Sequence, residues 1–332
     1  DSQIPEPDIS FIKKAINLIA PVLKKGEIII LESTSPVGTT EKISEWLSDL
    51  RQDLSFPHIS ESMPDINIAY CPERVLPGSI IKELVSNDRI IGGLTDSCSK
   101  KAIDLYKIFV EGSCKVTNAR TAEMVKLTEN SSRDVQIAFA NELSIICDLI
   151  DINVWELIAL SNLHPRVNIL QPGPGVGGHC LAVDPWFIVS KTPNQAKLIH
   201  TARNINDSKA SWVVKKIENC VKRFLLDHPG FEENEIVIAC YGLAFKPDID
   251  DLRESPAMSI TLDIAQCHSG RVLAVEPNIG LDQFNFENIE LVDSLYARDN
   301  AHIHVLLVDH KEFKSNKLQS NYLIDTKGIW SQ

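Results

Sequence analysis

A glycine-rich stretch ahead of a cysteine is the part of the sequence whose residue types most plainly suit chemistry. It reads GPGVGGHCLAVDPW, residues 173–186, with Cys180 as a candidate nucleophile and Asp184 four positions after it. The glycines between residues 173 and 178 also match G-x-G-x-x-G, the pattern of a dinucleotide-binding turn. The stretch is therefore either a phosphate-binding turn or a constrained turn that presents a thiol.

The sequence around these glycines argues against the phosphate-binding turn. Such a turn follows a strand, opens a helix and is followed by an acidic residue about 20 positions later. Here Pro172 and Pro174 interrupt any strand, and Pro185 prevents an ordinary helix from beginning at the cysteine. We expect the glycines to let the backbone pass close to a ligand and to hold Cys180 in an exposed turn. The competing interpretation is a tight turn with an incidental buried cysteine.

A second candidate segment is TAEMVKLTENSSRD, residues 121–134. Lys126, Asn130 and Arg133 are spaced at i, i+4 and i+7, so on a helix they share one face. Taken by itself, this spacing is typical of a solvated stripe.

A third segment is YGLAFKPDIDDLRES, residues 241–255. It places Lys246 and Arg253 just beyond a predicted strand, at the carboxyl edge where α/β sheets bind ligands. The acidic residues at 248, 250 and 251 lack the spacing of an EF-hand loop, so we interpret them as solvated loop acids and predict no metal site.

Composition restricts the class of protein. The formal net charge of −12 argues against nucleic acid or an anionic membrane as a partner, because both require basic patches. No apolar run approaches the ~18–20 residues that cross a bilayer. The eight cysteines form no C-x-x-C pair, which argues against a zinc site or a disulfide framework and favours reduced thiols in the cytoplasm.

Apolar spacing predicts the elements that must position these groups. Strands alternate with helices at both ends of the chain, which predicts mostly parallel sheets covered on both faces. A long helix at 121–150, with apolar stretches at 137–139 and 143–146, predicts a homodimer or larger oligomer built on it. The expected helices are 11–24, 39–50, 100–110, 121–150, 195–226 and 255–266, and the expected strands are 27–31, 67–70, 89–91, 236–241, 271–276, 302–309 and 322–324.

Several long motifs in order give the chain a resemblance to the UDP-glucose/GDP-mannose dehydrogenase family. The resemblance covers nearly the whole chain and is closest to the branch that oxidises UDP-N-acetyl-D-mannosamine. The residues His179, Pro185 and Trp186 beside the cysteine resemble that branch, as does Pro77, where the UDP-glucose branch usually has a second glutamate. The motifs are ESTSPVG (32–38), AYCPERVLPG (69–78), KLTEN (126–130), HPRVNILQP (164–172), GVGGHCLAVDPW (175–186) and GLAFKP (242–247).

The resemblance implies an α/β fold of two Rossmann-like parallel-sheet domains joined by a long central helix. It implies an NAD-binding remainder at 1–118, a helical central and dimerisation region with the catalytic loop at 119–215, and a UDP-sugar-binding domain at 216–332. The family's opening Gly-x-Gly-Tyr-x-Gly turn does not occur in the sequence, which we interpret as a first domain that is incomplete at its N-terminus.

The resemblance also implies an activity. Family members oxidise the sugar C6 alcohol to a carboxylate with two NAD⁺, through a cysteine thiohemiacetal and thioester, and supply surface polysaccharide of the enterobacterial common antigen type. It implies the catalytic residues Cys180, Lys126, Asn130, Asp184 and Glu73. The implied substrate contacts are Arg74, Val75, Arg133, His164, Arg166 (in a neighbouring subunit's site), Gly177 and Lys246, and the implied NAD contacts are Thr34, Thr40 and Arg253.

Three alternatives stay open at this point. The chain could be a non-catalytic fragment that binds a nucleotide sugar or forms an oligomer, because the glycine turn for NAD is missing. It could be a dehydrogenase of another UDP-sugar, of the UDP-glucose type. A cysteine hydrolase or acyltransferase is the weakest, because no His with an orienting Asn or Asp accompanies the cysteine as a motif.

Overall fold

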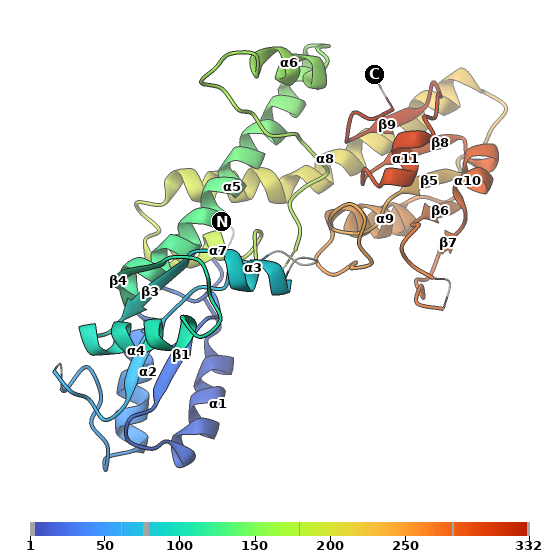
Figure 1. Ribbon diagram of the computed structural model, residues 1–332. Coiled ribbons are helices and arrows are strands. Elements are labelled where there is room, and N and C mark those ends of the chain that lie inside the picture. The colour runs from blue at the N-terminus through green and yellow to red at the C-terminus, as the bar shows by residue number, and fades with distance from the viewer. Residues whose placement is uncertain (1–3, 61, 76–79, 179, 281, 331–332) are drawn as a thin grey trace. The chain divides into compact units, whose positions relative to one another are not determined.

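The computed structural model describes residues 4–60, 62–75, 80–178, 180–280 and 282–330 (Figure 1). The motif residues Leu76, Pro77, Gly78 and His179 lie outside the described residues. The chain divides into two compact units. The first comprises Asp1–Ser131 and Asp184–Lys197, and the second comprises Ser132–Val183 and Leu198–Gln332.

The first unit contains a four-stranded sheet in the order β1-β2-β3-β4. β1 and β2 are parallel, β3 and β4 are parallel, and β2 and β3 are antiparallel. The carboxyl ends of β1 and β2 therefore share one edge of the sheet. The strands are β1 (Ile28–Leu31), β2 (Asn67–Tyr70), β3 (Arg89–Gly93) and β4 (Cys114–Asn118).

Helices cover both faces of this sheet, which explains why every residue of β2 is buried. Ile68 and Tyr70 point to one face and pack with Ile16 and Leu47 of the first two helices. Ala69 points to the other face, where α4 lies. The helical elements of this unit are α1 (Ser10–Ile19), η1 (Ala20–Val22), α2 (Thr39–Leu50), α3 (Ile80–Ser86), α4 (Asp96–Tyr106) and α7 (Asp184–Lys191).

The middle of the sequence contains two 31-residue helices, α5 (Ala119–Leu149) and α8 (Lys197–Asp227). The boundary between the units falls within α5, after Ser131. A shorter helix, α6 (Val154–Ser161), begins where the side chain of Asn153 accepts hydrogen bonds from the N–H groups of Trp155 and Glu156. The predicted long central helix is confirmed.

The second unit contains a five-stranded parallel sheet in the order β7-β6-β5-β8-β9, the arrangement of a doubly wound fold. One face packs against Val213 and Ile217 of α8 and against α9, and the other against Ala297 and Phe313. The elements are η2 (Glu233–Glu235), β5 (Ile238–Tyr241), α9 (Pro256–Cys267), β6 (Val272–Val275), β7 (Ile289–Leu291), α10 (Ser294–Asn300), β8 (Ile303–Leu306), α11 (Lys311–Ser315) and β9 (Leu323–Asp325).

The predicted α/β class with mostly parallel sheets is confirmed, and the antiparallel pair of β2 and β3 is the exception to the parallel pattern. The bounds of the three domains proposed from the sequence stay predictions. No helix in the described part of the chain is both long enough and apolar enough to cross a membrane.

Candidate active site

Three of the residues singled out in the sequence come together in the first unit. Asn130, on α5, donates a hydrogen bond from Nδ2 to Oδ2 of Asp184 at 2.5 Å. Asp184 is only 3% exposed, and this burial raises the pKa of its carboxyl to about 6, against the lowering effects of the Asn130 hydrogen bond and the Lys126 charge. A carboxyl that titrates near neutrality beside a cation is suited to proton transfer.

Asp184 owes its position to the way α7 begins. Pro185 follows it in the first turn of the helix, where a missing backbone N–H costs nothing. An acidic side chain there also interacts favourably with the helix dipole. After Cys180 the chain first turns back on itself, with the N–H of Val183 donating to the Cys180 carbonyl at 3.1 Å. The proline therefore delays the helix by four residues rather than excluding it.

The glycine loop that carries Cys180 lies in the second unit and is tightly packed. Gly178 has φ +88° and donates its N–H to the Glu254 carbonyl at 3.2 Å. A Cβ on Gly177 would lie 2.3 Å from that same carbonyl oxygen, so only glycine fits. The ring of Phe245 packs beside Gly178, and Cys180 itself is exposed. Among the residues of this stretch that the structure describes, no helix begins before Asp184, which excludes the phosphate-binding turn and fits a loop that presents the cysteine.

The charged residues after β2 are held by contacts within the first unit. Glu73 accepts hydrogen bonds at Oε1 from the N–H groups of Arg74 (2.6 Å) and Val75 (2.9 Å), and its Oε2 pairs with Arg89 at 3.3 Å. Arg74 pairs with Glu129 of α5 at 2.8 Å. These contacts fix the segment as it leaves the carboxyl edge of the sheet.

Other predicted substrate contacts lie on the second unit. Arg133, His164 and Arg166 are exposed, and the Arg166 N–H donates to Nδ1 of His164 at 3.3 Å. Lys246 is half-buried after β5, with its Nζ 5.9 Å from the centroid of the Phe245 ring.

The predicted cofactor contacts differ in exposure. Arg253 is exposed and pairs with Asp251 at 2.8 Å. Thr34 is half-buried in the loop after β1. Thr40 is fully buried, and its hydroxyl donates to Glu123 Oε1 at 2.7 Å.

Glu123 was not found by sequence reasoning. Its buried carboxylate also accepts from the N–H groups of Gly38 (2.6 Å) and Thr40 (2.8 Å), so α5 anchors the start of α2. Burial raises the pKa of Glu123. Nothing in the local sequence pattern marks Glu123 as buried. Tyr70, fully buried at the end of β2, was also missed, and its hydroxyl has no hydrogen-bond partner among the described residues.

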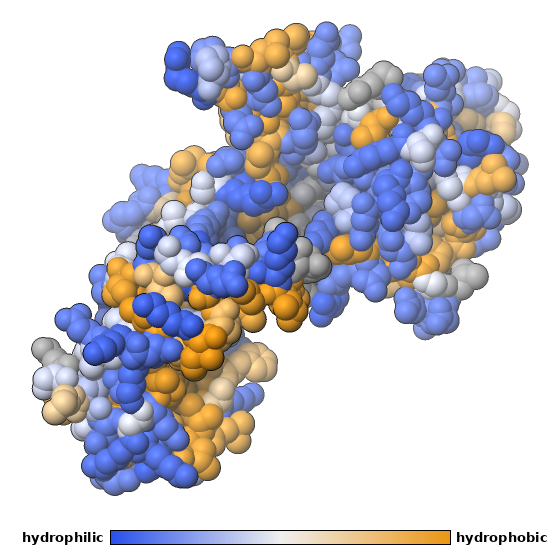
Figure 2. Space-filling view, in the orientation of Figure 1, coloured by the Kyte–Doolittle hydropathy of each residue, from blue (hydrophilic) through white to orange (hydrophobic). Residues whose placement is uncertain are grey.

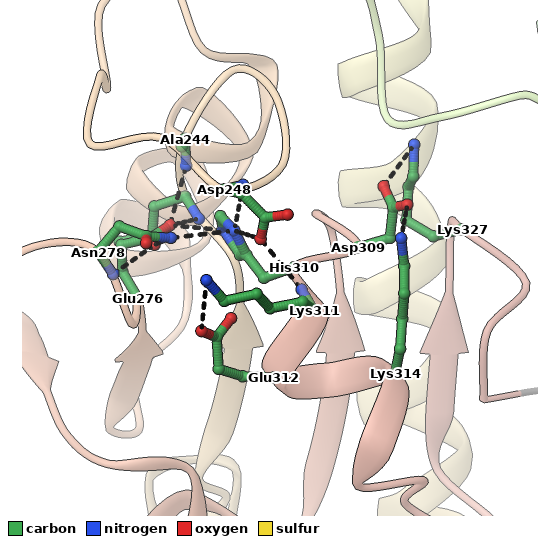
Figure 3. A network of polar contacts seen from close by, with 11 residues as sticks. Ala244, Asp248, Glu276, Asn278, Asp309, His310, Lys311, Glu312, Lys314 and Lys327 are labelled. Atoms are coloured by element: carbon green, nitrogen blue, oxygen red, sulfur yellow. Dashed lines mark hydrogen bonds and ion pairs between the residues drawn. The ribbon is translucent and has the colours of Figure 1, made fainter. Parts of the chain in front are cut away.

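A second buried carboxylate, Glu276, lies at the carboxyl edge of the second sheet (Figure 3). Its Oε2 accepts from the N–H groups of Leu243 (2.7 Å) and Ala244 (3.1 Å) and from His310 Nε2 (3.0 Å). Nδ1 of His310 in turn accepts from the Asp248 N–H, which fixes the loop that carries Lys246. Backbone N–H groups in this first turn are the ones that bind pyrophosphate in a dinucleotide site. Here the Glu276 carboxylate accepts from these N–H groups in the place of a pyrophosphate.

A cavity of about 290 Å³ lies wholly within the second unit. Its wall includes Gly173 at the start of the glycine loop, together with two tryptophans and two lysines. Lys327, which pairs with Asp309 at 3.3 Å, lies near Gly173 as well. Among the residues that the structure describes, no group of His, Cys, Asp and Glu is arranged to hold a metal ion. The tryptophans and lysines that line the cavity are Trp155, Trp212, Lys209 and Lys216.

Three family models match the chain in succession. They are the NAD binding domain of the UDP-glucose/GDP-mannose dehydrogenase family at residues 1–110, its central domain at 120–208 and its UDP binding domain at 239–332. The chain belongs to the UDP-glucose/GDP-mannose dehydrogenase family. It is an NAD-dependent UDP-sugar dehydrogenase, as the resemblance implied.

Similar proteins carry specific names. The chain is 59% identical to a UDP-N-acetyl-D-mannosamine dehydrogenase of Yersinia pestis and 57% identical to one of Escherichia coli, over 98% of this chain and 78% of each relative. It is 56% identical to an NDP-N-acetyl-D-galactosaminuronic acid dehydrogenase of Ralstonia solanacearum, over 98% of this chain and 76% of that one.

Solved structures of the family have the same fold. A UDP-D-ManNAc dehydrogenase from Pyrococcus horikoshii superimposes with a TM-score of 0.81 at 38% identity, over 98% of this chain and 74% of that chain. A UDP-N-acetyl-mannosamine dehydrogenase from Staphylococcus aureus gives 0.79 at 40% identity, over 100% and 75%.

The residues at the carboxyl edge of the first sheet fit an NAD contact. The hydroxyl of Ser35, next to Thr34, is buried and has no hydrogen-bond partner among the described residues. Buried hydroxyls are normally paired, so a polar ligand group at this edge would satisfy it. The family's NAD-binding model covers this loop.

Proposed function

We propose that this enzyme oxidises UDP-N-acetyl-D-mannosamine at C6 to UDP-N-acetyl-D-mannosaminuronate. The observation that carries the proposal is the Lys126–Asn130–Asp184 cluster, with the Asn130–Asp184 hydrogen bond of 2.5 Å, in a chain whose glycine loop exposes Cys180. The relatives named for this substrate, at 57–59% identity, support the choice of sugar.

Cys180 holds the carbon that is oxidised. NAD⁺, when bound, supplies the acceptor for each of the two hydrides that leave C6. After the first oxidation the Cys180 sulfur adds to the C6 aldehyde, forming a C–S bond, and the thiol proton moves to the carbonyl oxygen. After the second oxidation the C6 carbon is a thioester, which water hydrolyses to the carboxylate while the C–S electron pair returns to the sulfur.

The cluster on α5 and α7 handles charge and protons. Lys126 and Asn130 stabilise the oxygen on C6 where negative charge develops. Lys126 also accepts a proton from this oxygen or donates one to it. Asp184, with a pKa of about 6, accepts a proton from the attacking water. Glu73 is a second carboxylate for the same water and for proton transfer.

Charged and backbone groups of the chain bind the two ligands. Their roles follow from the family motifs, and Arg166 is assigned to the active site of a neighbouring subunit in a homodimer or larger oligomer. The substrate contacts are Arg74, Val75, Arg133, His164, Arg166, Gly177 and Lys246, and the cofactor contacts are Thr34, Thr40 and Arg253.

The product is an acidic amino-sugar donor, which suits the assembly of a surface polysaccharide of the enterobacterial common antigen type. Deletion of the gene is expected to remove the aminouronate from that polymer, as sugar analysis of the surface polysaccharide would reveal. An unchanged aminouronate content would contradict this role.

A second candidate substrate is an N-acetylgalactosamine nucleotide, because a relative with a related name is almost as similar at 56% identity. A glucose nucleotide is the third. Comparing kcat/KM for UDP-N-acetylmannosamine, UDP-N-acetylgalactosamine and UDP-glucose tests the proposal. The first is expected to be highest, and a higher value for either of the others would assign the enzyme to that sugar.

The cysteine mechanism is tested by Cys180→Ala, with Cys267→Ala as the matched control. Both cysteines are exposed, but Cys267 ends α9. We expect Cys180→Ala to form no sugar acid and Cys267→Ala to behave as the wild type. Normal acid formation by Cys180→Ala would refute the covalent step.

A further inference from the structure

A chain of buried amides connects the two long helices to the first glycine of the catalytic loop. The Gly173 N–H donates to Oδ1 of Asn141 on α5 at 2.9 Å. Nδ2 of Asn141 donates to Oδ1 of Asn206 on α8 at 2.9 Å. Nδ2 of Asn206 then donates to Oδ1 of Asp134 at 2.8 Å and to its carbonyl at 3.1 Å. All four residues belong to the second unit.

The groups at the two ends of this series of hydrogen bonds fix which atom donates and which accepts in each bond. A backbone N–H can only donate, so Asn141 must turn its oxygen toward Gly173 and its NH₂ toward Asn206. A carboxylate can only accept, so Asn206 must turn its NH₂ toward Asp134. Burial raises the pKa of the Asp134 carboxyl, and the guanidinium of Arg203, at 2.5 Å, opposes this effect. The backbone carbonyl of Asp134, to which Asn206 also donates, can only accept. Neither amide can rotate without losing a hydrogen bond at each of its two sides.

Because these residues are buried, the loss of one of their hydrogen bonds has a large free-energy cost. Asn141, Asp134 and Arg203 are 0% exposed and Asn206 is 1% exposed, so water cannot replace a lost partner. An unpaired buried amide costs more than an exposed one. The Asn206 backbone carbonyl lies in ordinary van der Waals range of Gly175, 3.4 Å from where a Cβ would be, so the side chain of Asn206 acts on the loop only through Asn141.

We infer that Asn141 and Asn206 are positioning residues for Cys180, acting through the backbone of Gly173. The loop is held at its start by Asn141 and near its end by the hydrogen bond from Gly178 to Glu254. With both ends fixed, the exposed cysteine that follows has a defined place. The inference rests on the proposed function for its catalytic consequence, but not for its structural one.

Hydrogen–deuterium exchange measures the structural consequence without any ligand. In Asn141→Ala, amides of the segment 170–183 should exchange roughly tenfold faster, the factor expected for the loss of one buried hydrogen bond. Asp293→Ala is the control, because it removes a side chain that accepts from the Tyr296 N–H at the start of α10. That variant should leave exchange in 170–183 unchanged. Equal exchange in the two variants would overturn the inference.

The serial arrangement gives a second criterion. Asn206 acts on the loop through Asn141, so Asn206→Ala in an Asn141→Ala background should add little to the exchange of 170–183. Effects of the two substitutions that simply multiply would show independent packing roles and overturn the relay. If Asn141→Ala does not fold, Asn141→Ser serves as the milder variant with the same expected direction.

Kinetics separate positioning from general damage. For Asn141→Ala we expect kcat for acid formation to fall roughly tenfold, in line with one lost hydrogen bond, while KM for NAD⁺ is unchanged. A matching fall in kcat for Asp293→Ala would mark the loss as unspecific and overturn the kinetic part. Should Cys180→Ala retain turnover, the proposed mechanism fails, while the exchange rates still decide the positioning role.

Discussion

Asn130 on α5 donates a 2.5 Å hydrogen bond to Asp184, the first residue of α7, across 54 positions of sequence. The bond stabilises the charged form of the carboxyl, and the nearby charge of Lys126 does the same. Burial acts in the opposite direction and prevails, so the pKa of Asp184 is about 6. The protonation state of this carboxyl is therefore set by a balance that single substitutions can shift.

The first prediction concerns the acid limb of the pH–rate profile. If Asp184 acts as a base, activity should fall as the pH drops through about 6, where its carboxylate becomes protonated. Asn130→Ala removes an interaction that lowers this pKa, so the limb should move to higher pH. The measurement is kcat against pH, with Thr128→Ala, an exposed residue on the same helix, as the control. If the acid limb of Asn130→Ala does not shift, the limb reports the titration of a group other than Asp184.

The second prediction concerns Lys126. Lys126→Ala should lower kcat by a factor on the order of 10²–10⁴, the usual range for a lost acid–base or oxyanion group, with little change in KM for the UDP-sugar. Lys115→Ala, at an exposed lysine on β4, is the control and should have no effect. Steady-state kinetics distinguish the alternatives. A rise in KM with kcat unchanged would make Lys126 a binding residue.

Local periodicity in the sequence was sufficient for the helices and strands with strong patterns. It predicted the bounds of α2 and β2 as the structure has them, because both have clear apolar spacing and sharp ends. It missed β4, whose residues Cys114–Asn118 are half-buried or exposed and therefore carry no buried apolar run. It also missed α7, because Pro185 was interpreted as a barrier to a helix rather than as a residue of its first turn.

Only some residues of the candidate site could be predicted from the sequence. The i, i+4 spacing placed Lys126 and Asn130 on one helix face, and the motif supplied Asp184. No local pattern connects Glu123 with Thr40, 83 positions away, or Asn141 with Asn206, 65 positions away. Such contacts depend on how helices pack, and a single asparagine or glutamate in a helix gives no sign that it is buried.

A third prediction concerns assembly through α5. Figure 2 shows apolar side chains on the surface of the second unit, and those on α5 include Phe139 (51% exposed), Ile146 (45%) and Leu149 (85%). Phe139 also lines an apolar groove of about 510 Å³ in the same unit. Apolar surface of this kind is typical of a protein interface, so we expect a homodimer or larger oligomer that buries it.

Phe139→Glu should therefore shift sedimentation toward the monomer at micromolar concentration, because it places a charge in the interface. Phe11→Glu is the control, since Phe11 is 73% exposed on α1 and should not affect assembly. A wild-type protein that sediments as a monomer, or a Phe139→Glu variant that assembles normally, would argue against an interface on α5.

The last prediction concerns Lys209, a buried cation on α8 that the proposed reaction does not use. Its side chain donates to Ser144 Oγ at 2.6 Å and lies 3.7 Å from the Trp212 ring centroid, yet the residue is only 2% exposed. Burial, aided by the charge of Lys216, lowers its pKa from 10.5 to about 7. Between these two values the unfolded chain holds a proton that the folded chain has lost. Lys209 therefore reduces stability most below pH 7, and stability is regained as the pH rises toward 10.5.

Lys209→Met keeps the length of the side chain and removes the charge. We expect it to raise Tm at pH 6, with a gain over the wild type that shrinks by pH 9, because the wild type has by then released its proton in the folded state. Lys222→Met is the control, since Lys222 is exposed on the same helix and takes no part in lowering the Lys209 pKa, and it should give no gain. Thermal unfolding at the two pH values is the measurement. A lower Tm for Lys209→Met at pH 6 would mean that the contacts with Ser144 and Trp212 outweigh the cost of burying the charge.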